Sequence, residues 1–173
     1  MILSGRKITD NVKNGKIQIE TFDELNVNHN SYDVTLGNKL LYYTDEYLDT
    51  AEKNNFEEII IPEDGFILEK GKFYVGHINE FIGSDFFVPI LHCKLTIAKL
   101  GLFIHVTANL IDIGNHCNFS LQIYATENIK VYPGMKVAQV SFWNVYGDIK
   151  LYKGKYKNVI GPASSQSYKH ASK

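Results

Sequence analysis

The feature that most constrains the fold of this chain is a series of short apolar segments, each followed closely by a turn signal. Residues 58–62 end on Pro62, residues 66–68 run into Glu69-Lys70-Gly71, and residues 73–76 follow that turn. Val, Ile, Thr and aromatic side chains favour strands, and 13% of all residues are aromatic. Short strands at this spacing, with turn signals between them, predict a sandwich or barrel.

Alternation of apolar and polar residues predicts further strands. Residues 118–126 alternate throughout, so their apolar and polar side chains lie on opposite sides of the strand. The apolar side consists of Phe119, Leu121, Ile123 and Ala125, and the other side consists of Ser120, Gln122 and Tyr124. Other strands are predicted at residues 16–20, 32–38, 39–43, 102–108 and 136–143, the last of them after a Pro133-Gly134 turn.

Few helices are expected, and all of them are short. Ser4 is placed to cap a helix within the first 16 residues, which Gly15 ends. Residues 91–102, beginning at Leu91, carry leucines at helical spacing and predict one or two helical turns. Residues 44–57 are polar and acidic, and they predict a loop or a short helix.

Length and charge exclude several classes of protein. The 173 residues fit a single domain, residues 1–173. The net charge of −1 lacks the basic excess of a dedicated nucleic-acid binder. No apolar run approaches the roughly 20 residues that span a bilayer, and the N-terminus lacks the apolar core of a signal peptide. We therefore expect a cytoplasmic protein with no nucleic-acid partner and no membrane contact.

The two cysteines give no sign of a metal site. Cys93 and Cys117 lie outside any CxxC or zinc-ligand spacing. Each has a histidine beside it, His92 and His116, but neighbouring residues on a strand point to opposite faces. We expect two reduced thiols and no metal held by side chains.

Seven segments in register resemble the dCTP deaminase family, over nearly the whole chain. They are MILSGRKI (1–8), SYDVTLGN (31–38), KLGL (99–102), HVTA (105–108), IDIG (111–114), YPGM (132–135) and a tail with Lys155-Tyr156, Gly161-Pro162 and Ser165. The resemblance implies a mainly β fold, a distorted β-barrel of the dUTPase-like type with a few short helices. The activity that it implies is conversion of dCTP to dUTP and ammonia, in pyrimidine deoxynucleotide metabolism.

The resemblance also implies an assembly and a lid. It predicts a homotrimer with nucleotide sites at the subunit interfaces. Composition alone describes residues 154–173 as a disordered end, but the resemblance makes them a flexible C-terminal lid over a bound triphosphate. No tightly bound cofactor is expected, whereas Mg²⁺ can accompany the triphosphate.

The catalytic position of the family is changed in this sequence. Removing the amine from cytosine needs a base that activates water and an acid that protonates the leaving group. A single glutamate does both in the family, and the matching residue is Gln122, ten residues after Asp112. An amide cannot take or give a proton at neutral pH, although it can hydrogen-bond a base.

The segment that contacts phosphate in the family also differs from the family pattern in this sequence. The family's Arg-Ser-Ser-x-Ala-Arg appears as residues 94–99, KLTIAK. Leu95 replaces a serine that contacts water and phosphate, and Lys99 replaces an arginine that helps to hold the catalytic water. Lysine keeps the charge but loses the planar fork of arginine. Lys94 and Thr96 match positions that contact phosphate, which the start of a helix also favours.

Other candidate residues match the family without such changes. Asp112 corresponds to a residue that contacts the sugar and that, in dUTPases, positions the attacking water. The alternative for Asp112 is a turn-capping role. Ala108 lies in the matching nucleotide-binding segment, and Tyr152, Lys155 and Tyr156 match positions that face the triphosphate; a solvated tail is the alternative for these three.

Three hypotheses follow from these matches. The first is a nucleotide-binding protein that no longer deaminates and that sequesters or senses a nucleotide. The second is a dUTP diphosphatase that uses Asp112 and magnesium to form dUMP and pyrophosphate. The third is an active dCTP deaminase with an atypical site, in which His116 or Glu127 replaces the glutamate. Richness in Lys, Asn, Ile and Tyr is typical of an AT-rich genome, such as that of a phage or a low-GC bacterium.

Overall fold

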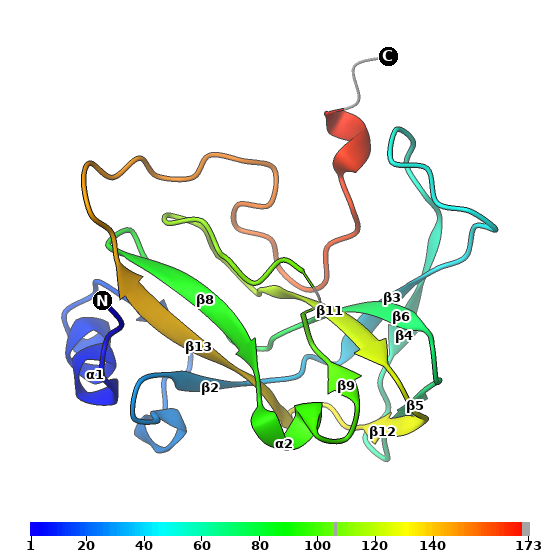
Figure 1. The fold of residues 1–173 in the computed structure, drawn as a ribbon, viewed down its shortest axis with the longest axis horizontal. Coiled ribbons are helices and arrows are strands. Elements are labelled where there is room, and N and C mark those ends of the chain that lie inside the picture. The colour runs from blue at the N-terminus through cyan, green and yellow to red at the C-terminus, as the bar shows by residue number, and fades with distance from the viewer. Residues whose placement is uncertain (106, 171–173) are drawn as a thin grey trace.

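The structure, a computed structural model, describes residues 1–105 and 107–170, and most of its regular elements are strands (Figure 1). The strands are β1 (Gln18–Ile19), β2 (Tyr32–Thr35), β3 (Lys39–Tyr43), β4 (Phe56–Ile60), β5 (Phe66–Leu68), β6 (Phe73–His77), β7 (Ile82–Gly83), β8 (Phe87–Cys93), β9 (Leu102–Phe103), β10 (His116–Cys117), β11 (Ser120–Ala125), β12 (Ile129–Val131) and β13 (Lys136–Asn144). The predicted mainly β class is confirmed.

The strands pair into four antiparallel sheets. The largest sheet has the order β4-β3-β6-β11-β9, and a second has the order β2-β13-β8. Two small sheets, β1-β7-β10 and β12-β5, complete the described strands. The expected barrel is therefore correct in its β character but not in closure, because β4 and β9 leave the largest sheet with two open edges within the described residues.

The helices are short. They are α1 (Gly5–Lys13), α2 (Leu95–Ala98) and the 3-10 turns η1 (Glu24–Asn26) and η2 (Ser167–Lys169). Ser4 stands at the N-cap of α1 as predicted, although its side chain makes no capping hydrogen bond. Within the described residues, no helix has both the length and the apolar character that crossing a membrane requires.

The helix predicted over residues 91–102 is wrong for most of its length. Only Leu95–Ala98 are helical, whereas Leu91 lies in β8 opposite Val140 of β13. β8 pairs with β13 over its whole length, and Leu91 is only 1% exposed. Burial and sheet pairing thus override the helical spacing, which is a weak local signal.

Three further predictions need smaller corrections. The strand expected at residues 102–108 is limited to Leu102–Phe103, and Val106 lies outside the described residues. The strand at residues 16–20 is limited to Gln18–Ile19, and the acidic loop ends where β4 begins at Phe56. β9 is short because it lies at the edge of its sheet and, within the described residues, pairs only with the end of β11.

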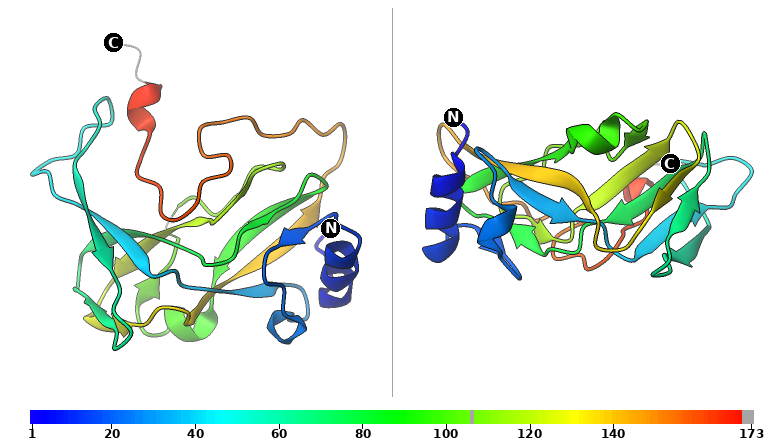
Figure 2. Two further views of the ribbon diagram at one scale, coloured as in Figure 1. Left: turned by 180° about the vertical axis from the view of Figure 1, so that it is seen from behind. Right: turned by 90° about the horizontal axis from the view of Figure 1, so that it is seen from below.

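The core lies between the sheets and positions the functional face. Tyr32, Tyr74, Phe119 and Phe142 are its largest fully buried aromatic residues. The apolar side of β11 faces this core, as alternation predicted, so its other side faces outward. The chain after β13 runs back along that outward side, and η2 ends near the loop between β3 and β4 (Figures 1 and 2).

Candidate functional site

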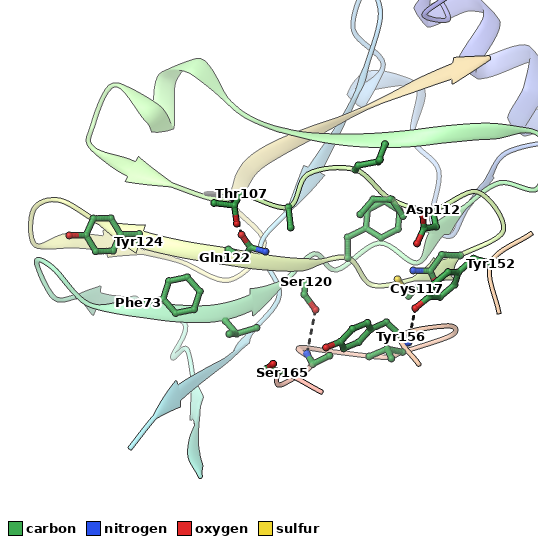
Figure 3. Close-up of a pocket in the computed structure, with 18 of the residues that line it drawn as sticks. Phe73, Thr107, Asp112, Cys117, Ser120, Gln122, Tyr124, Tyr152, Tyr156 and Ser165 are labelled. Atoms are coloured by element: carbon green, nitrogen blue, oxygen red, sulfur yellow. Dashed lines mark hydrogen bonds between the residues drawn. The ribbon is translucent and has the colours of Figure 1, made fainter. Parts of the chain in front are cut away.

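A cleft of about 790 Å³ lies between the outward face of β6 and β11, residues 107–112 and the C-terminal tail (Figure 3). Its walls are mainly aromatic and aliphatic, with a few polar side chains among them. Clefts of this size and character typically bind small organic ligands, because the apolar walls give affinity and the few polar groups give orientation.

Strand register assembles one wall of the cleft. Gln122 of β11 pairs with Val75 of β6, and Tyr124 pairs with Phe73. Directly opposed residues of antiparallel strands share a face, so these four side chains line the cleft together. The residues between them on β11 point into the core. Their packing there holds the cleft wall in place.

Gln122 has a defined amide orientation. Its Oε1 accepts a hydrogen bond from the backbone N–H of Thr107 at 3.2 Å. An amide nitrogen cannot accept from an N–H donor, so Oε1 must face Thr107 and Nε2 must face elsewhere. Within the described residues Nε2 makes no hydrogen bond, and Figure 3 shows the amide on the cleft wall.

A tight turn brings two more polar residues into the wall. The N–H of Asn115 donates to the carbonyl oxygen of Asp112 at 3.1 Å, and Gly114 between them has φ +84°. Glycine suits this turn, since other residues rarely adopt a positive φ. The Asp112 carboxylate accepts no hydrogen bond in the described part of the chain, and Asn115 Oδ1 is buried without a partner.

The C-terminal tail forms the outer wall. The N–H of Asn118 donates to Val159 O at 3.1 Å, and the N–H of Gly161 donates to Asn118 Oδ1 at 3.2 Å. Farther along, the N–H of Ser165 donates to the Tyr43 hydroxyl at 2.7 Å. The tail is thus attached to the sheets on both sides of the cleft by a few hydrogen bonds, and Val159 also packs, partly buried, against the core.

The structure brings half of the sequence-predicted site residues together. Ala108, Asp112, Gln122, Tyr152 and Tyr156 all line the cleft. Lys94, Leu95, Thr96, Lys99 and Lys155 are not part of its lining. Lys155 lies close by, since its Nζ is 5.5 Å from the centre of the Tyr156 ring and donates to Gln166 O at 2.6 Å.

Lys94 is engaged in an ion pair away from the cleft. Its Nζ lies 2.7 Å and 2.8 Å from the two carboxylate oxygens of Asp33, which also accepts from Asn28 Nδ2 at 2.7 Å. Lys136 Nζ is 3.5 Å from the same carboxylate. Burial would raise the pKa of Asp33, but hydrogen bonds from Lys94 and Asn28 and the lysine charges outweigh it and lower that pKa.

His116 and Glu127, which the sequence offered as alternative proton carriers, lie elsewhere. His116 Nε2 is 2.9 Å from Asp85 Oδ1, and its Nδ1 is 2.9 Å from Gln18 Oε1. Glu127 pairs with Lys70 on the surface. Neither side chain is part of the cleft lining.

Most of the cleft lining was not predicted from the sequence. The residues it left out are Tyr43, Phe73, Val75, Thr107, Leu110, Ile111, Asn115, Cys117, Phe119, Ser120, Tyr124, Val159, Ala163 and Ser165. Alternation already placed Ser120 and Tyr124 on the side of Gln122, so that signal was present in the sequence. The contributions of β3 and β6 depend on strand pairing, which a single sequence does not reveal.

Cys117 and Asp112 are groups of the cleft lining that bear on nucleophilic and metal-assisted chemistry. Burial raises the pKa of the Cys117 thiol to about 12, so this cysteine stays protonated at neutral pH and is a poor nucleophile. Residues 1–105 and 107–170 contain no group of three or more His, Cys, Asp or Glu side chains placed to hold a metal ion. Asp112 is the carboxylate of the cleft lining, and Mg²⁺ commonly binds one or two carboxylates together with substrate phosphates.

Comparison of sequences identifies close relatives. A family model described as "dCTP deaminase-like" matches residues 2–145. A protein of Clostridium beijerinckii named "dCTP deaminase, dUMP-forming" is 44% identical over 170 residues, which cover 98% of each chain. A protein of the same name from Cytophaga hutchinsonii is 41% identical over 171 residues, again 98% of each chain.

Comparison of structures agrees on the fold. The crystal structure of 2′-deoxycytidine 5′-triphosphate deaminase from Agrobacterium tumefaciens matches with a TM-score of 0.65 and 22% identity. The match covers 82% of this chain and 47% of that one, so this chain spans about half of the matched protein.

Proposed function

The chain belongs to the dCTP deaminase-like family, and from this premise we propose that it binds a pyrimidine deoxynucleotide in the cleft without deaminating it. The observation that carries the proposal is Gln122. This residue lies in the cleft wall at the position of the family glutamate, with its amide held by Thr107. A bound nucleotide that is not converted suits a protein that sequesters or senses it.

The chemistry of deamination supports this reading. The reaction needs one group that takes a proton from water and returns it to the leaving amine, and such a group typically contributes 10²–10⁴-fold in rate. A neutral amide does neither. Leu95 and Lys99 remove two further polar contacts of the family site, since leucine has no polar atom and lysine has no planar fork.

We also propose that the working site lies between subunits of a homotrimer. The cleft lining includes no lysine or arginine, whereas a triphosphate needs cations. Residues 94–99 carry Lys94 and Lys99, and Leu95 and Leu100, in and beside this segment, are 68% and 61% exposed, while Leu110 of the cleft lining is 63% exposed. A neighbouring subunit that covers these leucines would bring such a segment to the cleft. Light scattering after gel filtration should give the mass of three 19.7 kDa chains.

Two measurements test the main proposal. Calorimetry with dCTP, dUTP and dTTP should detect binding of at least one of them. Incubation of the protein with dCTP should release no ammonia above the background without protein. Ammonia release at rates typical of enzymes, with turnover of at least about 1 per second, would refute the non-deaminating reading.

A dUTP diphosphatase is the second candidate function. The Asp112 carboxylate, which accepts no hydrogen bond within residues 1–105 and 107–170, favours it, as does the dUMP-forming activity in the names of the relatives. This reaction needs no glutamate at position 122. In it Asp112 would orient the attacking water, and Mg²⁺ bound with the triphosphate would supply positive charge that neutralises the phosphate oxygens.

The diphosphatase candidate has its own prediction. With dUTP and Mg²⁺, the protein should form dUMP and pyrophosphate, and Asp112→Asn should lower the rate by about 10²-fold or more. Chromatography of the nucleotides measures both. The matched control is Asp148→Asn in the exposed loop after β13, which should leave the rate unchanged. Absence of dUMP with the parent chain would reject this candidate.

We propose that residues 154–170 act as the lid. A few hydrogen bonds and the packing of Val159 against the core hold them over the cleft, and so limited an attachment suits a segment that opens and closes. Saturating nucleotide should therefore slow trypsin cleavage at Lys155 and Lys157 by about tenfold or more. Cleavage at Lys53, in the exposed loop between β3 and β4, serves as the control and should not change. Equal slowing at all three lysines would argue against a lid.

A further inference from the structure

We propose that the cleft selects a pyrimidine with a keto oxygen at ring position 4, as in uracil and thymine, over cytosine with its amine. This inference rests on the proposed function, because it names the base that the same site prefers. It follows from the direction in which Gln122 presents its amide. The preference is opposite to that of an enzyme whose substrate is dCTP.

The Gln122 amide has a fixed direction in the cleft wall. The Thr107 N–H donates to Oε1 at 3.2 Å, which assigns the oxygen to that side. The remaining amide group, Nε2, carries two N–H donors and no acceptor. It has no partner within the described residues and lies on the cleft wall, so a ligand that offers an acceptor can bond it in place of water.

Apolar side chains surround this donor. Phe73 and Tyr124, which are paired across β6 and β11, are 39% and 36% exposed on the same face. Val75 lies directly opposite Gln122. Partly exposed rings beside a single amide suit a flat heterocycle, whose faces pack on apolar surface while one edge makes hydrogen bonds.

Pyrimidine bases differ in the group that they carry at ring position 4. At the ring position that the family resemblance places against residue 122, uracil and thymine carry an oxygen, which would accept from Nε2, whereas cytosine carries an amino group, which donates. Two donors facing each other leave both unpaired, and a site built around one hydrogen bond rejects a ligand that cannot complete it. A glutamate at position 122 would present an acceptor instead, so the amide reverses the polarity of this edge.

Calorimetry with non-hydrolysable α,β-imido analogues of dUTP and dCTP tests the inference in the full chain, because turnover then contributes no heat. The dUTP analogue should bind at least about tenfold more tightly, a difference of about 1.4 kcal/mol. Gln122→Met should abolish this preference, since methionine has similar length and no amide. Gln122→Glu should reverse it.

The matched control is Gln18→Met, which makes the same substitution on β1 outside the cleft and should keep the parent preference. Tighter binding of the dCTP analogue by the parent chain, or a preference that Gln122→Met leaves intact, overturns this inference alone. Failure of the parent chain to bind either analogue overturns the proposed function and this inference with it.

Discussion

Gln122→Glu is expected to give the protein a measurable dCTP deaminase activity, at least about 10²-fold above that of the parent chain. The substitution places a carboxylate where the amide now lies, and a carboxylate can take a proton from water and return it to the leaving amine. The Thr107 N–H, which now donates to Oε1 at 3.2 Å, would donate to a carboxylate oxygen and keep it in place. Ammonia release and dUTP formation measure the activity.

Matched variants sharpen this experiment. Gln18→Glu adds the same carboxylate on β1, away from the cleft, and should release no ammonia. Adding Leu95→Ser and Lys99→Arg to Gln122→Glu should raise the rate further, because these changes return a hydroxyl and a planar guanidinium to the phosphate segment. A triple variant that binds dCTP but releases no ammonia contradicts the view that these three residues prevent deamination.

Asp33→Ala is expected to lower the free energy of unfolding by about 2–3 kcal/mol at neutral pH. The Asp33 side chain is only 7% exposed, and its removal leaves Lys94 and Lys136 without their partner. The cost lies below that of a fully buried pair, because the two lysines are 25% and 45% exposed and can turn toward water. For a chain of this size the Tm should fall by roughly 4–12 °C.

The pH dependence of the same variant follows from the lowered pKa of Asp33. A carboxyl whose pKa is lower in the folded state than in the unfolded state adds stability above its unfolded value, and that stability is lost as the pH falls through the folded value. The difference between the parent chain and Asp33→Ala should thus be full at about pH 7 and shrink below about pH 4. Thermal melts across this range measure it.

An exposed carboxylate provides the comparison for these melts. Asp148→Ala in the loop after β13 should change the Tm by less than about 2 °C at any pH in the range. A difference for Asp33→Ala that stays constant down to about pH 3 would show that the aspartate does not act through its charge.

The ion pair also fixes Lys94 at the start of α2, the segment proposed to approach phosphate in a neighbouring subunit.

Local patterns predicted the parts of the fold that depend on neighbouring residues. The alternation in residues 118–126 gave β11 and the outward direction of Gln122, because each strand residue points opposite to the one before it. The same type of signal failed at Leu91, where helical spacing competed with pairing to β13. Pairing with a distant strand buries more apolar surface than a one-turn helix would. The residues next to Leu91 in the sequence carry no information about that pairing.

The candidate site divides in the same way. Asp112 and Gln122 were selected from the sequence by resemblance, and the structure places both on one cleft. Phe73 and Val75 were not selected, because their position beside β11 is set by register. Lys94 was selected for phosphate, but the structure pairs it with Asp33, and only folding brings that buried carboxylate within 2.7 Å.

The sequence by itself determined the family, the mainly β class and the lack of an ionisable side chain at position 122, because these depend on residue identity and short-range periodicity. Only the tertiary structure decided which way the Gln122 amide points, since that depends on the backbone N–H of Thr107, which residues 108–121 separate from it in the chain. Hydrogen-bond polarity is a property of contacts made after folding. The sequence therefore shows that residue 122 cannot exchange a proton, and the structure shows that its Nε2 is a donor facing away from Thr107.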